Sequence, residues 1–192
     1  RFVRAGQWPN GKFPLGNDLC GKTCGIVGLG KIGKTIAKRA AAFEMNIAYF
    51  RRGRPYDDVS YRHYGDLREL AQDSDYLIVI VPGGPDTQHL IDADVLRALG
   101  PKSFLINVAR GTVVDEKALV ASLLASEIAG AGLDVFDDEP NVPAELLKLD
   151  NVVLTPHIGS GTYETRQAMA DLVFANVKGY FEKGTLVTPV EL

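Results

Sequence analysis

The stretch that decides the fold is GIVGLGKIGKTIAKRAAAFEMNIAYFRRGRP, residues 25–55. Its first residues are apolar and strand-like, and GLGKIG follows directly at 28–33. The next part has apolar residues at helical spacing, namely Ile32, Ile36, Ala40 and Phe43. NIAYF at 46–50 then has the composition of a second strand. The stretch therefore predicts a strand, a glycine turn, a helix and a second strand in that order.

The glycine turn has the spacing of a dinucleotide-binding motif, with glycines at Gly28, Gly30 and Gly33. In such a motif the first glycine permits a tight turn and the second lets the backbone approach a pyrophosphate. The third lets the helix pack closely on the strand. Because the helix N-terminus attracts phosphates through free N–H groups, we also expect cofactor contacts from Lys31 and Ile32. A tight structural turn without a ligand is the alternative for a glycine motif taken alone.

Arginines follow the second strand, where dinucleotide-binding motifs usually place an acid. Arg51 lies about 20 residues beyond the glycine turn, at the position that contacts the adenosine ribose, and Arg52 is next to it. An acid there would bond the 2′-hydroxyl of NAD, whereas guanidinium groups bind a phosphate through charge-assisted hydrogen bonds. We therefore expect Arg51 and Arg52 to favour NADP(H), with NAD(H) still possible. A solvated basic loop is the alternative, and Asp57 or Asp58 would reach the ribose only if the loop bends back.

The rest of the chain alternates strand-like and helical segments. Apolar runs typical of buried parallel strands, covered on both faces, occupy 76–81, 104–108, 128–136 and 151–156. Helical patterns occupy 92–100, 116–127 and 161–184. This alternation predicts an α/β fold with a doubly wound parallel sheet, a Rossmann domain. We expect three parts: an N-terminal arm at 1–20, the Rossmann dinucleotide-binding domain at 21–160, and a long C-terminal helix with a tail at 161–192.

Composition narrows the classes of partner. The 192 residues are 46% apolar and carry a formal charge of −3, so they offer no general attraction for nucleic acid or an anionic membrane. No apolar run of about 18 residues predicts a membrane span. Cys20 and Cys24 have no neighbouring Cys or His cluster to complete a metal site, and so few cysteines suit a reducing, cytoplasmic setting. The chain begins at Arg1 without a methionine, and we expect it to be part of a longer protein.

Four later motifs extend the pattern over almost the whole chain. They are VPGGPDTQHLI at 81–91, NVARGTVVDE at 107–116, GLDVFDDEP at 132–140 and TPHIGSGT at 155–162. With GLGKIG before them, in this order and spacing, the chain resembles the D-isomer-specific 2-hydroxyacid dehydrogenase family, and within it the glyoxylate/hydroxypyruvate reductase-like members. Such an ordered set is far more specific than a glycine motif alone. The resemblance implies that the chain is the nucleotide-binding domain of an NAD(P)-dependent D-2-hydroxyacid dehydrogenase, or 2-ketoacid reductase.

The resemblance also implies a catalytic set of Arg110, Glu139 and His157. Reduction of a 2-keto acid needs a hydride at one carbon and a proton at its oxygen. His157 is the expected acid, since an imidazole exchanges protons near neutrality, and Glu139 would stabilise its charged form. Arg110 would orient the substrate carboxylate or keto oxygen. Each residue also has a purely structural alternative. His157 could be a histidine that only makes structural hydrogen bonds, Glu139 could be a turn residue before a proline, and Arg110 could be a surface charge.

Further cofactor contacts follow from the same resemblance. Asp134 would bond the nicotinamide carboxamide, although it could also be a plain loop acid, and Thr87 would reach a phosphate. The remaining expected contacts are Val81 and Pro82 at the adenosine, Val108 and Ala109 at the nicotinamide, and in addition Arg110, His157 and Gly159. These residues follow predicted strands, and ligands bind beyond the strand ends in open α/β sheets.

The resemblance implies that parts of the protein lie outside this chain. Family members have a smaller substrate domain, built largely from residues before the arm, and that domain is absent here. We therefore expect this chain to bind the cofactor but to turn over poorly or not at all by itself. The keto acid, glyoxylate or hydroxypyruvate first, would be selected by the other domain. A homodimer through the nucleotide-binding domain is also implied, with the arm around Trp8 contributing.

Two alternatives stay open. Nucleotide-sensing corepressors share this fold and the same catalytic residue types, so the chain could belong to an interaction protein. An NAD-dependent enzyme of the same family, such as a phosphoglycerate or formate dehydrogenase, is the second alternative. The arginine pair argues against both, because each would be expected to keep the acid that contacts NAD. We expect no metal, membrane or nucleic-acid partner.

Overall fold

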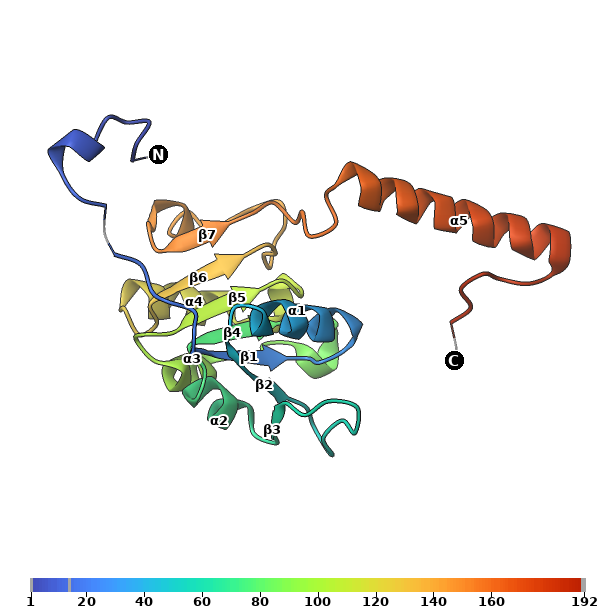
Figure 1. Ribbon diagram of the computed structural model, residues 1–192, viewed down its shortest axis with the longest axis horizontal. Coiled ribbons are helices and arrows are strands. Elements are labelled where there is room, and N and C mark those ends of the chain that lie inside the picture. The colour runs from blue at the N-terminus through green and yellow to red at the C-terminus, as the bar shows by residue number, and fades with distance from the viewer. Residues whose placement is uncertain (1, 14, 191–192) are drawn as a thin grey trace.

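Seven parallel strands form one sheet in the order β3-β2-β1-β4-β5-β6-β7 (Figure 1). The computed structural model describes residues 2–13 and 15–190. The strands are β1 (Thr23–Val27), β2 (Asn46–Phe50), β3 (Arg62–Tyr64), β4 (Tyr76–Val79), β5 (Phe104–Asn107), β6 (Gly130–Leu133) and β7 (Val152–Leu154). The strand order reverses between β1 and β4, which is the arrangement of a doubly wound sheet. The predicted Rossmann fold class is confirmed.

Helices cover the sheet in two layers. α1 (Lys31–Ala41) packs on one face, against β1 and β2. The other face carries α2 (Leu67–Gln72), α3 (Ala93–Leu99) and α4 (Glu116–Leu124). Each of these three begins with a side chain that accepts a backbone N–H of the first turn: Asp66, Asp92 and Asp115. Short 3-10 helices are η1 (Trp8–Asn10), η2 (Pro85–Thr87), η3 (Gly111–Val113) and η4 (Leu146–Lys148).

The core consists of two apolar clusters, one on each face of the sheet. The larger cluster lies under α2, α3 and α4 and includes Leu77 and Val27. The smaller cluster lies under α1 and includes Ile26 and the fully buried Tyr49. Successive residues of a strand point to opposite faces, which is why the adjacent Ile26 and Val27 belong to different clusters.

The face that carries α1 is covered only in part by the described residues. α1 lies over β1 and β2, whereas Ile106 of β5 is only half-buried and Val153 of β7 is 68% exposed. Parallel sheets are normally covered on both faces because both faces are apolar. This open half of the sheet is therefore a surface suited to contact with another element or subunit.

The predicted elements are all present, with differences at their edges. β3 and α2 were not predicted, because a three-residue RHY strand and a six-residue helix carry too little periodicity. The first helix ends at Ala41, so Phe43 lies beyond it and is exposed. Ile32 in the first turn is also exposed, so it does not share the buried face with Ile36 as the helical spacing suggested.

The two ends of the chain project from the sheet (Figure 1). α5 (Tyr163–Lys183) extends away from it, and none of the helix residues is buried. Its apolar side chains, Phe174 and Phe181 among them, are consequently exposed. The arm before β1 projects as well, and its Trp8 is 68% exposed.

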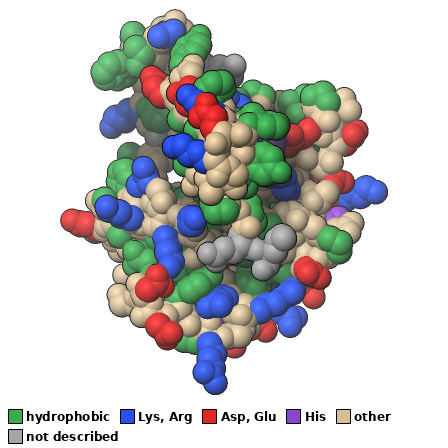
Figure 2. Space-filling view, turned by 90° about the vertical axis from the view of Figure 1, so that its right-hand side faces the viewer, with side chains coloured by type: hydrophobic (Ala, Val, Ile, Leu, Met, Phe, Trp, Pro, Cys, Tyr) green, Lys and Arg blue, Asp and Glu red, His purple; other side chains and the backbone are tan. Residues whose placement is uncertain are grey.

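Several features of the described residues concern membrane, nucleic-acid and metal partners. Within residues 2–13 and 15–190, no helix is long and apolar enough to cross a membrane. On the face shown in Figure 2, basic side chains are interspersed with acidic and apolar ones. The described residues contain no group of three or more His, Cys, Asp or Glu side chains that could hold a metal ion. Cys20 and Cys24 are both free thiols.

Candidate active site

The candidate site lies along the edge of the sheet where the carboxyl ends of the strands meet. The turn after β1 and the loop after β4 are neighbours there, at the point where the strand order reverses. Open α/β sheets bind their ligands at such a point. Two cavities lie at this edge, which we call the arginine cavity, beside Arg51, and the histidine cavity, beside His157.

The glycine turn is shaped by close approaches of the backbone. Gly28 has a φ of +102°, and a Cβ there would lie 2.8 Å from the carbonyl oxygen of Ile80. A Cβ on Gly33 would lie 2.2 Å from the carbonyl oxygen of Gly28, so a side chain would push α1 off the turn. By contrast, apart from its own chain neighbours and the backbone of α1, no atom of residues 2–13 and 15–190 lies within 4 Å of the position that a Cβ on Gly30 would take.

Gly30 is also the N-cap of α1, and it offers no side chain to the first turn. The first N–H groups of the helix are therefore open to an anion. Lys31 and Ile32 are exposed beside them. The turn thus fits the diphosphate of a dinucleotide, because it combines open space, free N–H groups and a nearby positive charge.

The arginine cavity has a volume of about 250 Å³. Residues from the ends of β1, β2 and β4 line it, among them Gly28, Phe50, Arg51, Arg52, Tyr56 and Val81. The guanidinium carbon of Arg51 lies 4.0 Å from the centre of the Tyr56 ring. The Arg52 guanidinium donates to the Asp86 carbonyl at 3.4 Å. The structure thus brings the glycine turn and both arginines to one cavity.

The residues expected at a phosphate and at the adenosine have different surroundings. Thr87 lines the arginine cavity, but its hydroxyl donates to the Pro82 carbonyl at 2.7 Å. In this structure the hydroxyl hydrogen is thus directed at a backbone carbonyl, and the expected contact of Thr87 with a phosphate stays a prediction. Pro82 lines the histidine cavity with His157, whereas Val81 lines the arginine cavity. The segment after β4 consequently borders both cavities.

The loop after β2 does bend back, but not toward the ribose position. The Asp58 carboxylate forms an ion pair with Lys34 of α1, and the hydrogen bond from Lys34 lowers the pKa of Asp58. Neither Asp57 nor Asp58 lines the arginine cavity. Within the described part of the chain, Arg51 and Arg52 are thus the charged side chains of this cavity.

The histidine cavity, of about 770 Å³, brings together the three residues expected to be catalytic. Arg110 follows β5, Glu139 follows β6 and His157 follows β7. His157 Nδ1 lies 2.7 Å from Glu139 Oε2, and the two side chains are 47% and 35% exposed. Because Nδ1 is bonded to the carboxylate, Nε2 is the ring nitrogen left for a ligand.

Glu139 is held from two sides. Its Oε2 bonds to His157, and its Oε1 accepts the Phe136 N–H at 3.1 Å. The pKa of Glu139 is lowered, mainly by the hydrogen bond with His157. The Phe136 N–H and the positive charges of His157 and Arg110 lower this pKa further, whereas burial raises it. The glutamate therefore stays ionised and orients the imidazole through Nδ1–H.

Asp134 holds the loop that carries His157. Its Oδ1 accepts the Thr155 hydroxyl at 2.5 Å and the Ile158 N–H at 2.9 Å, and its Oδ2 accepts the Gly159 N–H at 3.0 Å. Burial raises the pKa of Asp134, but these hydrogen bonds outweigh burial and lower the pKa overall. His157 has a φ of +50°, a left-handed conformation that needs support from its surroundings. The part played by Thr155 was not predicted, although Thr155 stands in the TPHIG motif.

Close packing also places the turn that carries Arg110. A Cβ on Gly111 would lie 2.0 Å from the backbone carbonyl of Phe136, so only glycine lets this turn touch the loop of Glu139. A Cβ on Gly83 would lie 2.9 Å from Arg110 Cγ, which places the arginine side chain against the segment after β4. Neither glycine was singled out from the sequence.

Asn107 shapes the same turn from inside the core. This buried side chain donates to the Arg110 carbonyl at 3.1 Å and accepts the Ala109 N–H at 3.1 Å. Ala109 itself is 2% exposed and its methyl group belongs to the core, so the expected contact of Ala109 with the nicotinamide stays a prediction for its backbone. Val108 is half-buried and remains a candidate for that contact.

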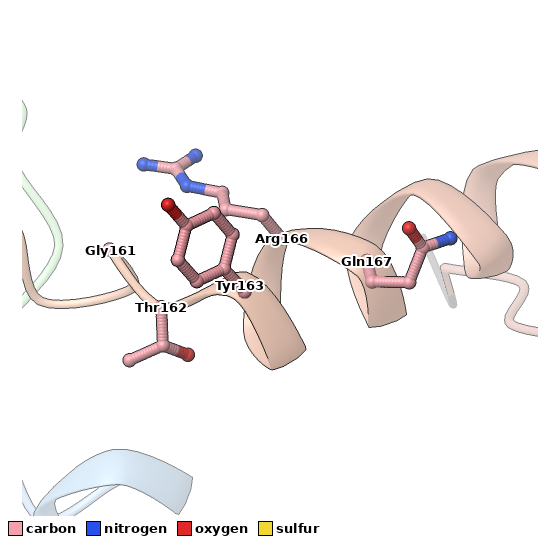
Figure 3. A pocket seen from close by; sticks show the side chains of 5 residues that line it. All are labelled: Gly161, Thr162, Tyr163, Arg166 and Gln167. Carbon is pink, nitrogen blue, oxygen red and sulfur yellow. The ribbon is translucent and has the colours of Figure 1, made fainter.

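A further hollow, of about 610 Å³, lies at the start of α5. Figure 3 shows Tyr163 and Arg166 extending to one side of the chain there, and Thr162 to the other. All its lining residues come from one exposed segment, residues 161–167, and no strand end contributes to it. The arginine and histidine cavities, which join several strand ends, are therefore the better candidate site.

Comparison with known proteins assigns the chain to a family. The family model described as "D-isomer specific 2-hydroxyacid dehydrogenase, NAD binding domain" matches residues 1–159. The chain belongs to this family. A hydroxyphenylpyruvate reductase of Plectranthus scutellarioides is 50% identical over 190 residues, 99% of this chain and 60% of that protein. The glyoxylate/hydroxypyruvate reductase A HPR2 of Arabidopsis thaliana is 50% identical over 191 residues, with the same two shares.

Solved structures of the family show the same architecture. An NADPH-dependent glyoxylate/hydroxypyruvate reductase of Sinorhizobium meliloti, solved with NADP and malonate, matches with a TM-score of 0.93 and 50% identity. The match covers 98% of this chain and 60% of that one. A 2-hydroxyacid dehydrogenase of Ketogulonicigenium vulgare Y25 matches with a TM-score of 0.93 and 39% identity, over 100% of this chain and 60% of that one. The chain thus spans about 60% of the length of these relatives, and the predicted family is confirmed.

We expect Asp134→Asn to destabilise the loop of His157. The carboxylate accepts three hydrogen bonds, whereas the amide offers one oxygen, so the free energy of unfolding should fall by about 1–2 kcal/mol near pH 7. The folded state lowers the pKa of Asp134. Its contribution is therefore complete above the unfolded pKa of about 3.9 and is lost as the pH falls through the lower folded value.

Urea denaturation of both proteins from about pH 7 down to about pH 2.5 measures this difference. The difference between the wild type and the variant should shrink below about pH 4. Asp57→Asn is the matched control, since Asp57 is exposed and its carboxylate makes no hydrogen bond or ion pair with any described residue. A difference that stays constant down to the lowest pH would show that the charge of Asp134 does not hold the loop.

Proposed function

We propose that the protein containing this chain is an NADPH-preferring reductase of small 2-keto acids, with glyoxylate or hydroxypyruvate as the first candidates. The observation that carries this proposal is the His157–Glu139 pair beside Arg110, on the same sheet edge as the arginine cavity. The histidine cavity offers a proton donor and an anion-binding group, and the arginine cavity offers charges for a phosphate. A dinucleotide lying along the strand ends would connect the two.

The catalytic roles follow from the geometry of the histidine cavity. A bound nicotinamide cofactor supplies the hydride. His157 donates a proton from Nε2 to the keto oxygen, while its Nδ1–H stays bonded to Glu139. Glu139 stabilises the imidazolium and keeps the ring oriented. Arg110, exposed at the same cavity, holds the substrate carboxylate through charge-assisted hydrogen bonds.

The cofactor roles follow the order of the strand ends. The glycine turn takes the pyrophosphate, since its helix N-terminus is open, with Lys31 and Ile32 beside it. Arg51 and Arg52 take the 2′-phosphate, and Val81 borders the adenosine. The nicotinamide end is formed by Val108, Arg110, Asp134, His157 and Gly159.

The relatives support this proposal on two points. The proteins of P. scutellarioides and A. thaliana are named as reductases, which favours an enzyme over a nucleotide-sensing corepressor. The S. meliloti reductase is described as NADPH-dependent, which favours NADPH over the NAD-dependent alternative. The relatives differ in keto acid, since one is a hydroxyphenylpyruvate reductase and the other a glyoxylate/hydroxypyruvate reductase.

We also propose a homodimer through the nucleotide-binding domain, with residues 1–20 as the contributing arm. Its support is the exposed apolar surface at Trp8 and on the open half of the sheet at Val153. Large exposed apolar patches mark interaction sites because water contact with them is unfavourable. Light scattering at micromolar concentration should give the mass of two chains, and a monomer would contradict the proposal.

The cofactor preference is tested by titrating NADPH and NADH, followed by fluorescence or calorimetry. The wild type should bind NADPH more tightly. Arg51→Ala and Arg52→Ala should each weaken NADPH binding about tenfold, because each removes a charge-assisted hydrogen bond to the 2′-phosphate. NADH binding should change by less than about twofold. Arg54→Ala is the matched control, since Arg54 is exposed on the same loop but does not line the arginine cavity.

Equal affinities of the wild type for NADPH and NADH would remove the proposed role of the arginines. An equal loss of NADPH binding in Arg54→Ala would assign the effect to the general charge of the loop rather than to the cavity.

The proposed acid is tested by His157→Gln in the natural full-length chain. Loss of the proton donor should lower kcat for glyoxylate reduction by about 10²- to 10⁴-fold, because general acid catalysis contributes that much. The Kd for NADPH should stay close to the wild-type value. His89→Gln is the control, since His89 is exposed and does not line the histidine cavity. A His157→Gln protein with wild-type kcat would exclude His157 as the acid.

A further inference from the structure

We propose that Tyr56 is a positioning residue that sets the preference for a 2′-phosphorylated cofactor by holding Arg51 at the arginine cavity. The inference rests on the proposed NADPH preference. The contact that carries it is the 4.0 Å distance between the guanidinium carbon of Arg51 and the centre of the Tyr56 ring. Both residues line the arginine cavity.

The contact matters because nothing else in the described structure holds the Arg51 side chain. Its backbone is fixed, since the Arg51 carbonyl bonds to His63 Nε2 at 2.9 Å and its N–H donates to the Tyr64 carbonyl at 3.4 Å. Its guanidinium forms no hydrogen bond or ion pair with any residue in 2–13 or 15–190. An exposed arginine otherwise samples many rotamers, and ordering it on a ligand costs conformational entropy. A cation–π contact orders the side chain and consumes none of its N–H donors.

Tyr56 is itself anchored, both by its ring, which lies 5.8 Å from the Tyr49 ring at the smaller apolar cluster, and by its backbone. The Tyr56 N–H donates to the hydroxyl of Tyr49 at 2.8 Å. Tyr49 belongs to β2 and is fully buried. This hydrogen bond does not involve the Tyr56 ring, so it is kept when the ring is replaced. Leucine at this position removes the aromatic platform under Arg51 while it keeps an apolar side chain toward the cluster.

A second cation lies near the same ring, but its charge is already compensated. Lys34 Nζ is 5.0 Å from the centre of the Tyr56 ring and forms an ion pair with Asp58. Arg51 has no such partner among the described residues, so it is the cation on this ring that remains ready for a phosphate. The ring thus presents a free guanidinium to the cavity while Asp58 holds the lysine.

The experiment compares two pairs of ligands that differ in the 2′-phosphate: NADPH with NADH, and adenosine 2′,5′-bisphosphate with 5′-AMP. Calorimetry on Tyr56→Leu should show NADPH and the bisphosphate bound about three- to fivefold more weakly, the loss expected for an exposed cation–π contact. NADH and 5′-AMP should bind as they do to the wild type. Tyr56→Phe keeps the ring and should retain the wild-type ratio.

Two further variants make the test specific. Tyr61→Leu removes another part-buried aromatic of the same loop and the same apolar cluster, and should leave the ratio unchanged. In an Arg51→Ala background, Tyr56→Leu should cause no further loss of NADPH binding, because the ring acts only through Arg51. Circular dichroism checks that each variant is folded.

The outcomes separate this inference from the function on which it rests. A wild type without any preference for NADPH would overturn the proposed cofactor. A preference that is lost in Arg51→Ala but kept in Tyr56→Leu would overturn the role of Tyr56 alone. An equal loss of NADPH and NADH binding in Tyr56→Leu would show that the ring contacts the adenine or supports the loop, and would also overturn it.

Discussion

The parallel pairing of β1 with β4 is the constraint on which the rest of the site depends. Cys24 pairs with Tyr76 and Val27 with Val79, so the two strands end at the same level. The turn of Gly28 therefore meets the segment after β4, so closely that a Cβ on Gly28 would lie 2.8 Å from Val81 Cγ1. The strands β5, β6 and β7 continue the same edge, and parallel pairing places all their carboxyl ends on it. Residues far apart in the sequence reach common cavities for this reason alone.

The edge is divided into two electrostatic environments. At the arginine cavity, the described lining residues include two arginines and no acid, which suits a phosphate. At the histidine cavity, Glu139 bonds to His157, and Asp134, behind the lining, bonds to the loop that carries the histidine. These two acids orient an imidazole whose Nε2 stays free, and Arg110 adds an anion-binding group. A ligand with a phosphate at one end and a reactive ring at the other matches this division.

The sequence predicts what depends on long patterns and on strand ends. Apolar runs and the glycine turn are sufficient for the sheet, and the rule that ligands bind beyond strand ends places Arg110, Glu139 and His157 on one edge. The sequence does not predict which hydrogen-bond partner or which surroundings an individual side chain takes. Thr87 gives its hydrogen to a backbone carbonyl, and the methyl group of Ala109 turns into the core. Such choices depend on loop geometry, which composition and spacing do not determine.

The structure of the protein in complex with NADP tests the central claim, that one sheet edge holds a 2′-phosphorylated dinucleotide with its nicotinamide beside the histidine. We expect the 2′-phosphate to lie within hydrogen-bonding distance of the Arg51 and Arg52 guanidinium groups. We also expect the nicotinamide ring to lie in the histidine cavity, next to His157. A 2′-phosphate that lies in solvent away from both arginines, or a nicotinamide outside that cavity, would contradict it.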